Sequence, residues 1–283
     1  MTAARGATKK PPAERNPRVG ALLRWTLIIV VPVLVLSGAG LFFAPDATRP
    51  LWPWDIGPFN AAFLGAFYLA SAAGIALAAW GGRWFPARIV TPMMFVFTAT
   101  VLLVTLLELA RFNFAHWLTY AWFVIFLGLP LASGASLLRY RTWPAPSDRA
   151  TPAGWRLVLL ALGFFFLLYG AGLFLFPATV SAHWPWPLDA LHARTYSAIF
   201  TASAVALLGL ANEADPTERL ALGAAAAGLG LLAIFGLIII DAARHTVAWG
   251  SLGVWLWLAI FAVYFALGLG LIWWSGARGE ERA

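Results

Sequence analysis

The sequence GAGLFFAPDATRPLWPW at residues 38–54 recurs 132 residues later as GAGLFLFPATVSAHWPW at residues 170–186. Nine of the 17 positions are identical, and they include both Trp-Pro-Trp segments. The same offset places Arg24 on Arg156 before this stretch. Ala70-Ser71-Ala72 falls on Ala202-Ser203-Ala204 after it. Repetition at a fixed spacing predicts that the two halves of the chain share one architecture.

The later part of each half aligns at an offset of 133. This offset pairs Glu108 with Asp241, Arg111 with Arg244 and Trp122 with Trp255. The change from 132 to 133 implies that the two halves differ in length by one residue. We interpret the chain as two tandem copies of one unit.

The composition excludes a water-soluble protein. Of 283 residues, 61% are hydrophobic and 11% are charged, whereas soluble domains are about half apolar and about a quarter charged. Eight apolar runs are long enough to cross the hydrocarbon core of a bilayer, and each should be a helix because lipid cannot satisfy an open sheet edge. The runs are Ala21–Phe43, Phe59–Trp80, Ile89–Ala110, Trp117–Leu138, Leu157–Phe176, Leu191–Ala211, Leu220–Ile240 and Ala248–Trp274.

The predicted fold class is therefore an all-α integral membrane protein with eight transmembrane helices in two four-helix repeats. Because each repeat has an even number of spans, both have the same orientation, and a pseudo-two-fold axis should follow the membrane normal. The first span matches the fifth, an internal helix, so we expect it to be structural rather than a cleaved signal. The predicted organisation is a basic disordered arm (1–20), repeat 1 (21–142), a cytoplasmic linker (143–156), repeat 2 (157–275) and a cytoplasmic tail (276–283).

The basic residues predict the orientation. With eight spans, 15 of the 19 Lys and Arg residues fall on the side of the termini. The positive-inside rule therefore places both termini in the cytoplasm of a cell-membrane protein. The net charge of +7 follows from this asymmetry, so it does not indicate a nucleic-acid partner. The basic residues on the other side are Arg49, Arg111, Arg194 and Arg244.

Small residues mark the expected packing faces. Ala66, Ala70, Gly74 and Ala78 recur at four-residue spacing on the second span, and Ala198, Ala202 and Ala206 do so on the sixth. Small side chains let membrane helices approach closely. We expect spans two and six to pack tightly.

Two acid and arginine pairs close the third and seventh spans on the outer side: Glu108 with Arg111, and Asp241 with Arg244. Side chains three residues apart share one face of a helix, and a carboxylate at the edge of the hydrocarbon needs a partner. Either the pairs lock helices together, or they serve proton-linked or substrate binding. We hypothesise that an arginine holds each acid.

The Trp-Pro-Trp segments lie in the outer connections. Tryptophan rings favour the headgroup level, so Trp52, Trp54, Trp184 and Trp186 are predicted interfacial anchors. The alternative is a lid or re-entrant loop over a cavity, with paired rings forming an aromatic wall for an apolar or cationic ligand.

Motifs for catalysis or cofactor binding are missing from the sequence. It contains no cysteine, no phosphate-binding loop and no Gly-x-Ser-x-Gly elbow, so no cofactor is indicated. Spacing is poor for a metal site, and hydrogen bonding at the interface or a pH response are the other roles for histidine. The four histidines, all on or near the outer face, are His116, His183, His192 and His245.

Three functions remain open. The first is a non-enzymatic membrane protein that lies in the lipid bilayer and binds a small molecule, lipid or partner protein at its outer face. The second is a small-molecule transporter that uses the interface between the repeats, although the mid-span positions are almost wholly apolar. The third is a membrane-embedded enzyme with an outer site of histidine and carboxylate groups.

Overall fold

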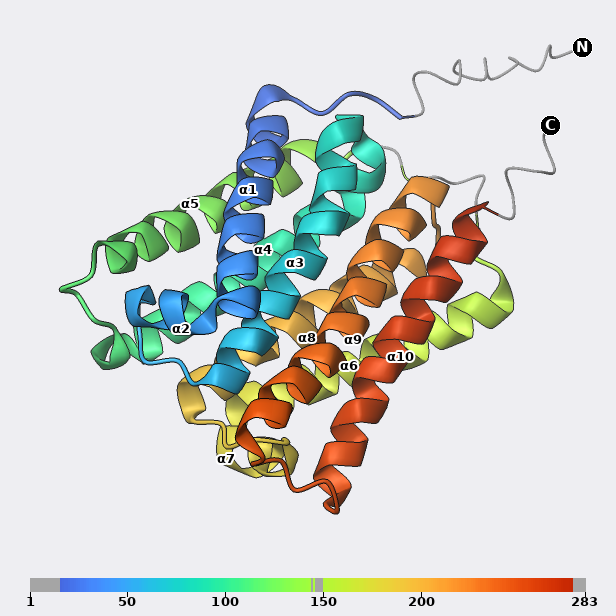
Figure 1. Ribbon diagram of the computed structural model, residues 1–283. Helices are drawn as coiled ribbons and strands as arrows, with labels where there is room; N and C mark the ends of the chain where they lie inside the picture. The colour runs from blue at the N-terminus through green and yellow to red at the C-terminus, as the bar shows by residue number, and fades with distance from the viewer. Residues whose placement is uncertain (1–15, 144, 146–149, 277–283) are drawn as a thin grey trace, which may run out of the picture.

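The structure is a computed structural model that describes residues 16–143, 145 and 150–276 (Figure 1). Over these residues the fold is helical, and eight helices are long and apolar enough to cross a membrane. This confirms an all-helical, multi-pass membrane protein. The eight are α1 (Ala21–Phe43), α3 (Pro58–Gly81), α4 (Trp84–Leu107), α5 (Trp117–Tyr140), α6 (Ala153–Leu175), α8 (Ala190–Leu210), α9 (Pro216–Arg244) and α10 (Leu252–Gly276).

Short helical turns follow α1, α4 and α6. After α1 come α2 (Pro45–Thr48) and the 3-10 turn η2 (Arg49–Leu51), and after α6 come α7 (Pro177–Val180) and the 3-10 turn η4 (Ser181–His183). Both α2 and α7 begin with a proline, whose missing amide donor costs nothing in a first helical turn. The 3-10 turn η3 (Leu109–Arg111) follows α4.

Both described ends of the chain lie at one end of the bundle, here called the terminal end, and the opposite end is called distal (Figure 1). Asn16–Gly20 was assigned to the disordered arm from the sequence. Instead, Val19 N donates to Gly82 O at 3.1 Å and Trp84 N donates to Pro17 O at 2.8 Å. This part of the chain is therefore fixed to the connection between α3 and α4, and residues 1–15 lie outside the described residues.

The third span has the helix start that lies furthest from its predicted position. It begins at Trp84 instead of Ile89, with a kink at Phe85, whose backbone is not helical (φ −92°, ψ 116°), and it includes Arg88, which forms an ion pair with Glu218. It ends at Leu107, and Glu108 is the residue that caps it. Glu108 and Arg111 are therefore not on one face of an α-helix as predicted, since Leu109–Arg111 forms a 3-10 turn.

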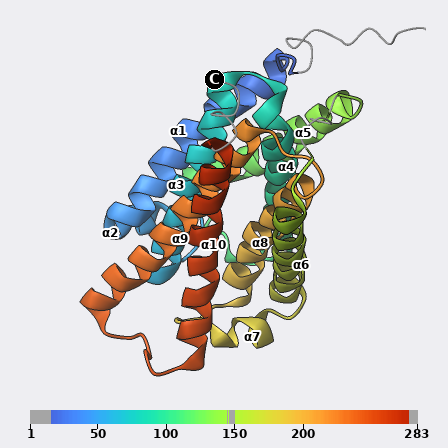
Figure 2. The same ribbon diagram turned by 90° about the vertical axis from the view of Figure 1, so that its right-hand side faces the viewer.

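In the centre of the bundle, helices from one half of the chain pack against helices from the other half. Within each half, α1 packs along α3, and α6 packs along α8. Between the halves, α3 packs against α9 and α4 packs against α8, while α5 and α10 lie on the outer sides of α4 and α9. Figure 2 shows α10 beside α9 and α6 beside α8.

The small residues on α3 face α9. A Cβ added to Gly74 would lie 2.8 Å from Ala221 O, and one added to Gly228 would lie 3.3 Å from Ala70. These close approaches confirm tight packing of the second span. Its partner is α9, however, and the sixth span packs against α6 and α4 instead.

Candidate functional site

The four tryptophan rings of the Trp-Pro-Trp segments are buried in the hydrophobic core. Trp52 and Trp54 pack against Trp122, with ring centroids 5.9 Å and 4.8 Å away. The predicted role as interfacial anchors is therefore wrong, because these rings pack on protein instead of facing lipid headgroups.

The rings of the second Trp-Pro-Trp segment pack against Trp257 in the same way. The rings of Trp184 and Trp186 lie 6.2 Å and 5.5 Å from it. Trp255, which the offset of 133 matches to Trp122, is exposed instead. Trp257, and not Trp255, therefore makes the ring contacts with the second segment that Trp122 makes with the first.

Two indole hydrogen bonds cross between the halves at the distal end. Trp54 Nε1 donates to His192 Nε2 at 3.2 Å, and Trp186 Nε1 donates to Asn60 Oδ1 at 2.7 Å. The offset of 132 that relates Trp54 to Trp186 also relates Asn60 to His192. Tyr196 adds a second donor to Asn60 Oδ1 at 3.0 Å.

His192 connects the Trp54 hydrogen bond to the ion pair between Asp189 and Arg111. Because an indole can only donate, His192 Nε2 accepts and the proton lies on Nδ1, which is 2.7 Å from Asp189 Oδ1. Asp189 also caps α8 by accepting from His192 N at 2.9 Å, and Arg111 Nη2 donates to its other oxygen at 2.6 Å. Burial raises the pKa of Asp189, but the contacts with His192 and Arg111 outweigh it and lower the pKa to about 2.

Glu108 is paired with Arg194, which comes from the second half of the chain. An arginine does hold this acid, as hypothesised, but it is not the neighbouring Arg111, whose partner is Asp189. Two ion pairs thus join the end of α4 to the start of α8. Arg194 Nε also donates to Phe174 O at 3.3 Å.

Asp241 has a different environment. It accepts from Thr246 N and Val247 N, both at 2.8 Å, and from Trp249 Nε1 at 2.7 Å. The loop after α9 therefore satisfies this carboxylate, and the hypothesis that an arginine holds Asp241 is wrong. Arg244 is exposed and forms no ion pair with a described residue.

The histidines do not converge. His192 is buried, His116 caps α5, and His183 and His245 are exposed. Within the described ranges, no group of three or more His, Asp and Glu side chains is arranged to hold a metal ion.

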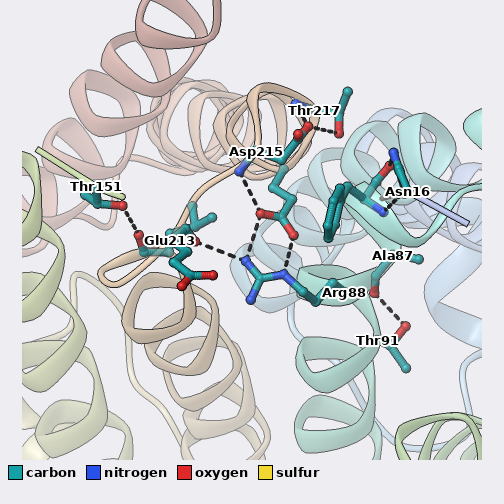
Figure 3. Close-up of polar contacts among 11 residues, drawn as sticks. Asn16, Ala87, Arg88, Thr91, Thr151, Glu213, Asp215 and Thr217 are labelled. Atoms are coloured by element: carbon teal, nitrogen blue, oxygen red, sulfur yellow. Dashed lines mark hydrogen bonds and ion pairs between the residues drawn. The ribbon is translucent and has the colours of Figure 1, made fainter. Parts of the chain in front are cut away.

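A buried ion pair at the terminal end of the bundle was not predicted from the sequence. Arg88 on α4 donates to both carboxylate oxygens of Glu218 on α9, at 2.6 Å and 2.9 Å, and to Glu213 O at 3.0 Å. Figure 3 shows the guanidinium group of Arg88 beside Glu213 and below Asp215 in the connection between α8 and α9. Glu218 is fully buried and also accepts from Asp215 N at 2.9 Å, which completes a capping box at the start of α9.

The capping box in this arrangement could be predicted from the local sequence. An acid followed three residues later by Glu is the signature of a capping box, and Asp215-Pro-Thr-Glu218 has it. The pairing with Arg88 has no such signal, because the two residues are 130 positions apart.

A cavity of about 620 Å³ lies in the first half of the chain. Residues of α1, α3, α4 and α5 form most of its wall, and α8 and α9 close its inner side. The wall is almost entirely apolar. Trp25 on α1 and Val124 on α5 are wall residues that are also 61% and 72% exposed, so the cavity opens to the outside of the bundle between these helices.

Comparison with known proteins gives no match: no family model, no curated protein and no solved structure matches the chain.

Proposed function

We propose that this protein binds a lipophilic molecule, taken up from the bilayer, in the cavity between α1 and α5. The observation that carries the proposal is the cavity itself. Its volume of about 620 Å³ is within the range of ligand pockets, about 300 to 1,000 Å³. Its opening faces sideways, at the depth of the membrane-spanning helices.

The chemistry of the wall favours an apolar occupant. Water needs several polar partners to occupy a buried space, and Met94, Phe97 and Phe126 offer it none. The hydrocarbon outside the opening supplies acyl chains at high concentration. An acyl chain or a similar apolar body is thus the occupant that fits both the wall and the surroundings.

We also propose the two-repeat arrangement predicted from the sequence, with a pseudo-two-fold axis along the membrane normal. The helix pairs support it: α1 with α3 corresponds to α6 with α8, and α3 with α9 corresponds to α8 with α4. The glycine contacts agree, since Gly38 meets Gly65 O and Leu69 while Gly170 meets Ser197 O and Thr201. The terminal end would be cytoplasmic, because it carries most of the basic residues.

In this proposal the distal cluster joins the halves. Glu108, Arg111, Asp189 and Arg194 pair with one another, and Trp54 occupies the free nitrogen of His192. These groups satisfy each other's hydrogen bonds, so they are better suited to holding α4 on α8 than to binding an outer ligand. The Trp54 contact also argues against catalysis, because it covers the nitrogen that a general base would use.

Transport is the second candidate, because both halves contribute to the cavity wall. Ile199 and Ser203 on α8, and Leu222 on α9, face the same space as the residues of the first half. Movement of one half against the other would change this wall.

Photo-crosslinking tests the binding proposal. The protein is reconstituted in phosphatidylcholine vesicles that contain a trace of phosphatidylcholine with a diazirine in its acyl chain. We expect labelling of Met94, a buried wall residue that an acyl chain contacts only inside the cavity. Ser71→Phe fills the cavity and should abolish this labelling, whereas Leu168→Phe on the exposed face of α6 should not. Labelling confined to exposed residues would overturn the proposal.

A further inference from the structure

Two arginines face each other at the terminal end of the first half. Arg18, in the segment before α1, and Arg83, directly before α4, pair in an antiparallel bridge. Both are exposed. Arg83 Nη1 donates to Asn16 O at 3.1 Å, and neither arginine forms an ion pair with a described residue. Like charges directly opposite each other are destabilising, so this pairing favours an anion beside it.

The connection between α8 and α9 has the same backbone contact but not the same charge. Thr151 N donates to Asn212 O at 3.1 Å, which corresponds to the bond from Val19 N in the first half. The residues that pair in the bridge there are Ala150 and Glu213, one neutral and one acidic. The positive-inside rule accounts for arginines at the terminal end, but not for an arginine pair on one bridge and an acid on the other.

Two further arginines lie beside the same backbone. The guanidinium of Arg139, in the last turn of α5, lies against Gly20, with its Cζ 3.7 Å from a Cβ added there. The guanidinium of Arg24, near the start of α1, lies against Gly82, with its Nε 3.7 Å from a Cβ added there. Both arginines are exposed and form no ion pair with a described residue. The name basic patch is used below for Arg18, Arg24, Arg83 and Arg139.

The basic patch adjoins the terminal end of the cavity. Ala21, the first residue of α1, and Trp25 belong to the cavity wall. On α5, the wall residue Ala132 precedes Arg139 by seven residues, so the two lie on one face of the helix. Arg24 and Arg139 are therefore on the two helices between which the cavity opens.

The cavity is long enough for an acyl chain. Its wall on α1 extends from Ala21 to Ser37, and at 1.5 Å per residue this distance is about 24 Å. Half of the hydrocarbon core of a bilayer is about 15 Å thick. A chain from the leaflet at the terminal end can therefore lie in the cavity while its headgroup stays at the level of the basic patch.

We infer that the ligand of this cavity is an anionic phospholipid from the leaflet at the terminal end. Its phosphate lies at the basic patch, and one acyl chain extends through the cavity from Ala21 towards Ser37. The inference rests on the proposed function and names its ligand class. Arginine binds phosphate oxygens through charge-assisted hydrogen bonds, and basic groups at a membrane surface favour a lipid of net negative charge.

The test compares two photo-crosslinking probes in phosphatidylcholine vesicles. One is phosphatidylglycerol with a diazirine in its acyl chain, which is anionic, and the other is phosphatidylcholine with the same chain at the same mole fraction. We expect phosphatidylglycerol to label Met94, a buried wall residue, at least about fivefold more strongly. One basic group near an anionic lipid corresponds to about this factor.

Substitutions in the basic patch should remove this preference. Arg24→Gln and Arg139→Gln should each weaken labelling by phosphatidylglycerol about fivefold and change labelling by phosphatidylcholine less. Arg139→Lys keeps the charge and should keep most of the labelling. Arg156→Gln is the matched control, because the offset of 132 pairs Arg156 with Arg24 and this exposed residue of α6 is outside the cavity wall. It should leave labelling by both probes unchanged.

Inorganic phosphate distinguishes a lipid headgroup site from a site for a free anion. Phosphate has no chain that enters the cavity, so we expect it to reduce labelling no more than sodium chloride does at the same ionic strength. Stronger competition by phosphate than by sodium chloride would overturn the assignment of the basic patch to a lipid.

The outcomes separate this inference from the proposed function. Equal labelling of Met94 by the two probes, or labelling by phosphatidylglycerol that neither Arg24→Gln nor Arg139→Gln weakens, would overturn the anionic-lipid inference and leave the lipophilic-ligand function standing. Absence of Met94 labelling by both probes in the unmodified protein would overturn the proposed function itself.

Discussion

Arg88 and Glu218 form a bidentate ion pair in which the carboxylate has no exposure to solvent. A buried ion pair is weak evidence for stability as a whole, but removing Arg88 takes both of its hydrogen bonds from a carboxylate that has no exposure to solvent. We predict that Arg88→Met lowers the free energy of unfolding by about 3 kcal/mol, measured by titration with sodium dodecyl sulfate in mixed micelles. Arg244→Gln, at an exposed arginine that forms no ion pair with a described residue, should change it by less than about 0.5 kcal/mol. Equal effects of the two substitutions would contradict this account.

Asp189 makes stability depend on pH. Its folded pKa of about 2 is below the ordinary value of 3.8, so folding favours the charged carboxylate. The stabilisation is complete above the ordinary pKa and is lost as the pH falls toward 2. After allowance for solvent screening of this partly exposed group, we expect a loss of about 1 kcal/mol between about pH 5 and pH 2. The unfolding midpoint of Asp189→Asn should not show this loss of stability as the pH falls. Parallel pH profiles of the midpoint for the two proteins would show that Asp189 is not the group responsible.

Local sequence predicts that an acid needs a partner, but not which partner it obtains. Glu108 at the edge of the hydrocarbon does pair with an arginine, yet Arg194 is 86 residues away. Asp241 obtains its hydrogen bonds from a loop whose backbone turns at His245, where φ is 53°. Composition and residue spacing do not encode such backbone geometry. The sequence therefore predicts the same role for the Glu108–Arg111 and Asp241–Arg244 segments, whereas in the structure an arginine holds Glu108 and a loop holds Asp241.

The elements themselves were predicted well, because hydropathy decides whether a segment spans a membrane. All eight spans are present among the described residues, and α1 has the predicted bounds. The errors are at helix ends such as Trp84, where the span continues past a kink at Phe85 that hydropathy does not encode. The buried tryptophans were misplaced for a related reason, since their contacts with Trp122 and Trp257 come from distant helices.

The contact between α9 and α10 depends on glycine. A Cβ at Gly268 would lie 2.2 Å from Ala227 N, so any side chain there must push the helices apart. We predict that Gly268→Ala lowers the free energy of unfolding by about 1 to 3 kcal/mol, measured by the same titration. Gly81→Ala, at a helix end with nothing within 4 Å of the added atom, is the matched control and should be neutral or slightly stabilising. An unchanged Gly268→Ala protein would show that α9 and α10 are not packed this closely.

In the whole molecule, helices of the two halves alternate, and the ion pair between Glu108 and Arg194 is one of several links between them. We predict that residues 1–143 and 150–283, expressed as separate chains in one cell, purify together. Glu108→Arg should reduce this recovery about fivefold, because it places two positive charges at one contact. Adding Arg194→Glu restores opposite charges and should restore recovery. A charge exchange that fails to do so would mean that this pair does not hold the halves.

The cavity is a property of the whole molecule, and no segment of the sequence predicted it. Its wall combines six helices, and it exists because small or short side chains such as Ser37 and Ser71 coincide on α1 and α3. Native mass spectrometry of the protein extracted gently from membranes tests the binding claim most directly. We predict that one lipid remains bound to the unmodified protein and is absent from Ser71→Phe. Equal lipid retention by both proteins, or by neither, would contradict a lipophilic-ligand site between α1 and α5.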